Sequence, residues 1–119
     1  MPVPYVDLWL SAFALTLAVE LAVAVPLLAG AEPSRVRRAG LVFFANLSSH
    51  PIVWFVLPQL GLAHPATVMA SETWAVAIEL VFYVLVVRVP WPRALAVSAL
   101  ANGASFSAGL LVHAATAWT

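Results

Sequence analysis

The chain has no cysteine and carries very little charge, since only 8% of its 119 residues are Asp, Glu, Lys or Arg. Without cysteine it can form no disulfide, no thiolate metal site and no cysteine nucleophile. Methionine occurs only at Met1 and Met69, so a soft Cu(I) site is not expected. The formal net charge is zero, which argues against nucleic acid as a partner. No basic residue precedes the first apolar run, and we therefore expect no removable signal peptide.

Apolar side chains are abundant instead: 64% of the residues are hydrophobic. Four apolar segments come close to the ~20 residues that a helix needs to cross a bilayer. They lie at about residues 6–29, 36–60, 71–89 and 93–118. Residues 61–70 are expected to form a connection, with Ser71 capping the third helix. The sequence predicts an all-α, polytopic membrane protein: one domain, residues 1–119, of four transmembrane helices in an antiparallel bundle. We expect a multi-pass location, most simply in a bacterial inner membrane.

The basic residues predict an orientation. All five are arginines, and they fall in the first and third connections, at Arg35, Arg37, Arg38, Arg88 and Arg93. Under the positive-inside rule both connections are cytoplasmic, which places both termini outside. The tryptophans mostly lie near predicted span ends, as an aromatic belt would, at Trp9, Trp54, Trp74, Trp91 and Trp118.

A polar stretch from Asn46 to Pro51 interrupts the second apolar span. In hydrocarbon an unsatisfied polar group costs several kcal/mol, roughly. Pro51 also has no amide hydrogen for the carbonyl group one turn earlier. Asn46, Ser49 and His50 recur at three- and four-residue spacing, so one helix face carries them. Polar groups elsewhere in the protein must therefore form hydrogen bonds with the residues of this face.

The other three spans carry similar polar stripes. They consist of Thr16 and Glu20 in the first span, Glu72, Glu79 and Tyr83 in the third, and Asn102, Ser105, Gly109 and His113 in the fourth. We expect the stripes to face one another, because the alternative is lipid. The predicted binding residues are His50, Glu79, Asn46, Glu20, Glu72, Asn102 and Ser105. Asn and Ser in these stripes are equally typical of hydrogen bonds that hold membrane helices together.

Glu79 and His50 lie at similar depth and are predicted to form the central pair. Burial favours the neutral form of a glutamate unless a cation lies nearby, and a protonated His50 is one candidate cation. A divalent metal is the other, because histidine and carboxylate ligands without sulfur suit zinc, manganese or iron. The candidate metal ligands are His50, Glu79 and Glu72, although no closely spaced ligand motif is present. His64 is expected to lie in a connecting loop.

Three short motifs carry a resemblance: Asn-x3-His-Pro-x2-Trp at 46–54, Glu-x6-Glu at 72–79, and Asn-x2-Ser-x3-Gly at 102–109. This combination resembles a pattern in small bacterial four-span membrane proteins. The resemblance covers the second to fourth spans and implies a four-helix fold, but it implies no particular activity. In size, and in the acidic residue of its first span, the chain is also similar to small multidrug resistance transporters, although the rest of their pattern is absent.

We therefore expect an integral membrane protein whose buried His/Glu/Asn site binds or transports a cation, a proton or a small polar solute. Because four spans enclose little volume, a pathway is expected to require a homo-oligomer, most simply a dimer. One alternative is a membrane-embedded, metal-dependent enzyme that acts on a lipid-borne or hydrophobic substrate. The other is a non-catalytic subunit of a membrane complex. Besides the solute, the expected partner is the lipid bilayer.

Overall fold

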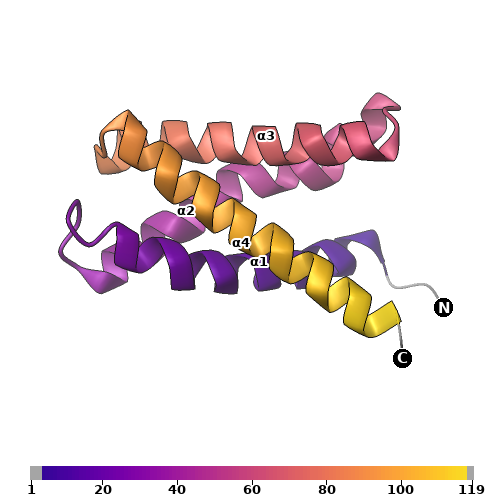
Figure 1. Cartoon of the computed structure of the whole chain (residues 1–119), viewed down its shortest axis with the longest axis horizontal. Helices are drawn as coiled ribbons and strands as arrows, with labels where there is room; N and C mark the ends of the chain where they lie inside the picture. The colour runs from indigo at the N-terminus through magenta and orange to yellow at the C-terminus, as the bar shows by residue number, and fades with distance from the viewer. Residues whose placement is uncertain (1–3, 118–119) are drawn as a thin grey trace.

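The computed structural model describes residues 4–117, and in these residues it is all-helical. The elements are α1 (Tyr5–Leu27), α2 (Arg35–Phe55), a 3₁₀ turn η1 (Leu57–Leu60), α3 (His64–Phe82), a π-helical turn η2 (Tyr83–Val87) and α4 (Trp91–Ala117) (Figure 1). The four α-helices, two of them extended by η1 and η2, are each long and apolar enough to cross a membrane. They indicate a multi-pass membrane protein. The predicted end of the fourth span at Trp118 lies outside the described residues.

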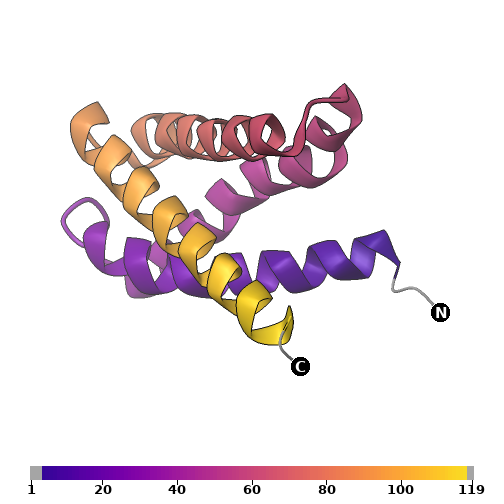
Figure 2. The same cartoon turned by 45° about the vertical axis from the view of Figure 1, so that its right-hand side comes forward.

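Neighbouring helices pack in a ring, with α1 against α2, α2 against α3, α3 against α4 and α4 back against α1. Helix α4 runs obliquely across the others instead of parallel to them (Figures 1 and 2). The α1–α2 and α3–α4 connections lie at one end of the molecule, together with the arginines, which are in the α3–α4 connection and in the first turns of α2 and α4 (Figure 1). The start of α1 and the α2–α3 connection lie at the other end. We call these the arginine end and the opposite end.

Local signals explain the turn at the arginine end. The Ser34 hydroxyl caps α2 by accepting a hydrogen bond from the Arg37 amide at 3.3 Å. The Arg38 guanidinium folds back and donates to the carbonyl oxygens of Glu32 and Pro33 at 2.8 and 3.1 Å. Arg93, in the first turn of α4, donates to the Leu27 carbonyl at the end of α1 at 2.9 Å. Arginine side chains therefore bind carbonyl groups of the α1–α2 connection and of the end of α1, which the helices leave without a partner.

Helix α3 differs from its predicted form at both ends. It begins at His64, so Ser71 is not its cap and lies inside the helix, and His64 is a helical residue and not a loop residue. Pro65 explains the early start, because a proline is well suited to the first turn of a helix. At the other end the π-helical turn leads to Arg88, which adopts a left-handed conformation (φ 63°) and precedes the break at Pro90.

Polar and apolar residues are distributed in the reverse of a soluble protein. Large apolar side chains are exposed on all four helices, whereas polar side chains on all four are buried. An apolar core does exist toward the arginine end, where Leu28, Val42, Tyr83 and Val89 pack with small residues of α4. Toward the opposite end the interior is polar. Lipid is the solvent in which this distribution is favourable.

Candidate functional site

Glu20 of α1 and Glu79 of α3 meet in the interior, and neither side chain has any exposed surface. The helices that carry them are not neighbours in the ring, so the two carboxyl groups reach across it, close enough to interact. Ser49 of α2 donates to Glu79 Oε2 at 3.2 Å. Among the described residues no donor reaches Glu79 Oε1 or either oxygen of Glu20. The site is therefore a buried carboxyl pair with a surplus of acceptors.

The charge on this pair follows from its contacts. The charged groups that act on Glu20 are Glu79 and Glu72, which are acidic like itself. Two ionised carboxylates cannot hydrogen-bond to each other, because each only accepts. In a low-dielectric interior, contacting carboxylates share a proton instead of both ionising. At least one proton, or another cation, must accordingly be held between Glu20 and Glu79.

Two more buried oxygens lie in the same interior. The Asn46 amide donates to the Val42 carbonyl at 2.9 Å, which leaves its Oδ1 atom without a donor among the described residues. Tyr83 is fully buried and lies one turn beyond Glu79. It is near enough for an electrostatic interaction with both glutamates. Its hydroxyl is also unpaired among the described residues. The polar stripe of the third span included Tyr83, but the predicted site did not.

His50 occupies a different environment from the one predicted. Its Nδ1 accepts a hydrogen bond from the Trp9 indole at 3.1 Å. Its ring packs edge-on against Phe13 and stacks on Trp54, at centroid distances of 5.3 and 6.4 Å. The described contacts of Glu79 are instead with Ser49, Glu20 and Asn102. The structure therefore does not pair His50 with Glu79.

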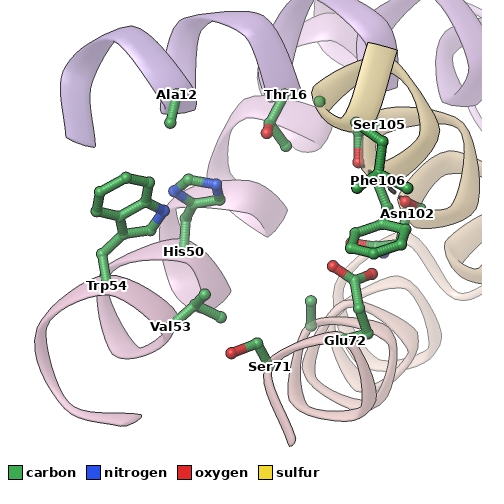
Figure 3. Close-up of a pocket in the computed structure, with 13 residues that line it drawn as sticks. Ala12, Thr16, His50, Val53, Trp54, Ser71, Glu72, Asn102, Ser105 and Phe106 are labelled. Atoms are coloured by element: carbon green, nitrogen blue, oxygen red, sulfur yellow. Dashed lines mark hydrogen bonds between the residues drawn. The ribbon is translucent and has the colours of Figure 1, made fainter. Parts of the chain in front are cut away.

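A pocket of about 260 Å³ lies between all four helices, beside the carboxyl pair. Figure 3 shows His50 and Trp54 of α2 on one side and Glu72 of α3 on the other, below Phe106 of α4. Asn102 and Ser105 also line it, together with Thr16. Asn102 joins the pocket to the pair, because its side chain also lies close enough to interact with the Glu79 carboxyl group. Four of the seven predicted binding residues therefore line this pocket: His50, Glu72, Asn102 and Ser105.

 Glu20 and Glu79 form the carboxyl pair and do not line the pocket, and neither does Asn46.

Serine and asparagine side chains also connect the helices to one another and to their own backbones. Asn102 donates to the Ser98 carbonyl at 2.9 Å, and the Ser105 hydroxyl donates to the Asn102 carbonyl at 3.1 Å. Ser98 is fully buried and donates across to the Val76 carbonyl of α3 at 2.9 Å. The sequence analysis missed Ser98, although it lies four residues before Asn102 and extends the same stripe. The Ser98–Val76 bond is an interhelical hydrogen bond of the kind expected of such residues, and the other two bonds lie within α4.

The three candidate metal ligands are not brought together. His50 and Glu72 stand on different sides of the pocket, and Glu79 lies in the carboxyl pair (Figure 3). Within residues 4–117, no group of three or more His, Cys, Asp or Glu side chains is arranged to hold a metal ion. The prediction that His50, Glu79 and Glu72 share a zinc, manganese or iron ion is therefore not supported by the geometry.

Comparison of the chain with protein-family models, with curated proteins and with solved structures finds no match.

Proposed function

We propose that the protein transports protons or small cations across a membrane, with the Glu20–Glu79 pair as its central binding site. The observation that supports this most strongly is the contact between two fully buried carboxyl groups with no basic side chain among the groups that act on Glu20. Such a pair requires a positive charge from outside the chain, and a proton is the smallest one available. Ionisable residues inside a membrane are costly, and function is the usual reason for them.

A purely structural role explains the pair less well. If Glu20 and Glu79 served only to join α1 to α3, asparagine or glutamine would provide donors as well as acceptors at a lower cost of burial. The buried Asn46 and Asn102 show that this chain does use amides inside the ring. Three carboxyl oxygens that lack a donor among residues 4–117 are instead suited to a site that gains and loses a positive charge.

The surroundings of the pair favour a transporter over an open channel. The pocket leads to the pair from one side, through Asn102. Toward the arginine end the apolar core that includes Leu28, Val42 and Val89 closes the interior. A site that is reached from one side and closed on the other is what alternating access requires. With the arginine end cytoplasmic, as the positive-inside rule expects, the pocket would face outward.

Proton flux in reconstituted liposomes tests this proposal. The full chain is reconstituted around a trapped pH-sensitive dye, and a potassium diffusion potential drives proton entry. We expect flux above that of empty liposomes, and a loss of most of it in Glu20→Gln and Glu79→Gln, which keep the shape of the side chain. Asp7→Asn is the matched control, since Asp7 is an exposed carboxylate of α1 outside the pair.

Two results would overturn the proposal. One is a wild-type protein that conducts no more protons, sodium or potassium than empty liposomes. The other is undiminished flux in both glutamine variants, which would show that the pair is not on the pathway. A protein without any flux that co-purifies with another membrane protein would instead favour the non-catalytic subunit.

A further inference from the structure

The pocket beside the carboxyl pair has a hydrogen-bond donor on one wall. Because an indole nitrogen only donates, the bond from Trp9 fixes His50 Nδ1 as an acceptor. The neutral imidazole then carries its hydrogen on Nε2. Figure 3 shows one ring nitrogen of His50 directed into the pocket. This wall therefore offers an oriented donor at His50 Nε2.

The other wall has a carboxyl group and an aromatic ring. The Glu72 side chain is half-buried and points toward the ring of Phe106 (Figure 3). Trp54 lies on the first wall instead, where its ring stacks on that of His50 (Figure 3). An aromatic face attracts a cation within about 6 Å of its centre, and desolvation strengthens this attraction. A carboxylate beside the Phe106 ring is a suitable environment for an organic ammonium group.

The size of the pocket limits the ligand. Its volume of about 260 Å³ is below the roughly 300–1,000 Å³ of sites for drug-sized molecules. The ligand must be compact, and the two walls require different groups at its two ends. The ammonium end faces Glu72, and a hydrogen-bond acceptor faces His50.

We propose that this pocket binds a small organic ammonium ion that carries a hydroxyl or similar acceptor at its other end. The inference rests on the proposed transport function, because it names the class of solute that would enter the same site. Its position is consistent with that function. Asn102 lines the pocket and also lies near Glu79, so a cation bound there would stand beside the carboxyl pair and favour its ionised form.

Binding of ethanolammonium chloride to the purified full chain in lipid nanodiscs tests the inference, measured by isothermal titration calorimetry. We expect saturable binding that methylammonium, which lacks the hydroxyl group, shows more weakly. Sodium and potassium at the same concentration should not displace ethanolammonium. Glycerol, which has hydroxyl groups but no charge, should not bind.

The affinities of single variants show what each wall of the pocket contributes to ethanolammonium binding. Glu72→Gln should weaken ethanolammonium binding about tenfold or more, because it removes the charged partner. Phe106→Leu should weaken it by roughly three- to thirtyfold through the lost cation–π contact. His50→Ala should lower the affinity for ethanolammonium but not that for methylammonium, so the preference between the two disappears. Asp7→Asn is the control and should bind like the wild type.

The melting curve of each variant shows whether it folds. The comparison of ethanolammonium with methylammonium is made on the wild-type protein, so it tests the inference even if a variant fails to fold. The inference is overturned if neither ammonium ion binds, if sodium competes equally well, or if Glu72→Gln binds with full affinity. These outcomes are separate from those of the flux assay. Proton flux that depends on Glu20 and Glu79 without ammonium binding would refute the proposed ammonium ligand but not the transport function. Ammonium binding without any flux would refute the transport function but not the ligand.

Discussion

Replacing Glu79 with glutamine should make the protein more stable while removing its proposed function. The side chain keeps its shape, and its Oε1 atom can still accept from Ser49, as Glu79 Oε2 does at 3.2 Å. The new amide group supplies a donor for Glu20, both of whose oxygens lack one among the described residues. The variant also no longer needs a proton or cation between the two side chains.

The magnitude follows from that proton. In the unfolded chain a glutamate has an ordinary pKa near 4.3. Each pH unit above that pKa adds about 1.36 kcal/mol to the free energy of keeping the carboxyl group protonated. Holding a carboxyl group protonated at pH 7 therefore costs the folded state up to about 4 kcal/mol. The variant loses the hydrogen bond of the shared proton and gains one from its amide, which roughly offset each other. We expect Glu79→Gln to unfold with a free energy about 2–4 kcal/mol higher at pH 7.

The sign of the pH dependence provides the check. Near pH 4 the unfolded chain also holds the proton, so the cost disappears and the variant should lose its advantage. The assay is denaturant or thermal unfolding of both proteins in the same detergent at pH 7 and near pH 4. Asp7→Asn should change the stability by no more than about 0.5 kcal/mol at either pH, because that carboxylate is exposed. A variant less stable than wild type at pH 7, or an advantage that is the same at both values, would refute the reasoning.

Two further predictions concern side-chain hydrogen bonds to backbone carbonyl groups. Ser98→Ala removes the bond from α4 to the Val76 carbonyl of α3 and should lower the free energy of unfolding by about 0.6–2 kcal/mol. An unchanged unfolding curve would contradict this. Arg38→Ala removes the donor to the Glu32 and Pro33 carbonyls and should lower the free energy of unfolding by about 1–3 kcal/mol without changing ammonium binding. A loss of ammonium binding at equal stability would contradict the assignment of Arg38 to the fold alone.

The sequence predicted the four apolar helices and the faces that carry polar residues. Spacing of three and four residues placed Asn46 and Ser49 on one side of α2, and both are buried. The same logic identified Glu20 and Glu79 as interior groups, and both are fully buried. These predictions depended on helical periodicity and on the cost of polar groups in lipid, which are properties of single helices.

The partners could not be predicted in the same way, because they depend on how each helix is rotated and how obliquely it crosses its neighbours. His50 follows Ser49 directly and is turned by about 100° around the helix. That rotation is enough to place Ser49 against Glu79 and His50 against Trp9. The prediction that residues 61–70 form a connection was wrong for a local reason, since Pro65 is well suited to the first turn of a helix and α3 begins at His64.

Infrared spectroscopy of the carboxyl groups tests the central claim most directly, because a protonated carboxyl group absorbs separately from an ionised one. The wild-type protein in lipid at pH 7, without added metal or ammonium ions, should show a protonated-carboxyl band that resists hydrogen exchange. We predict that this band is lost in Glu20→Gln, in Glu79→Gln and in the double variant, and is unchanged in Asp7→Asn. A wild-type spectrum without such a band, or the same band in the double variant, would contradict a proton shared by Glu20 and Glu79.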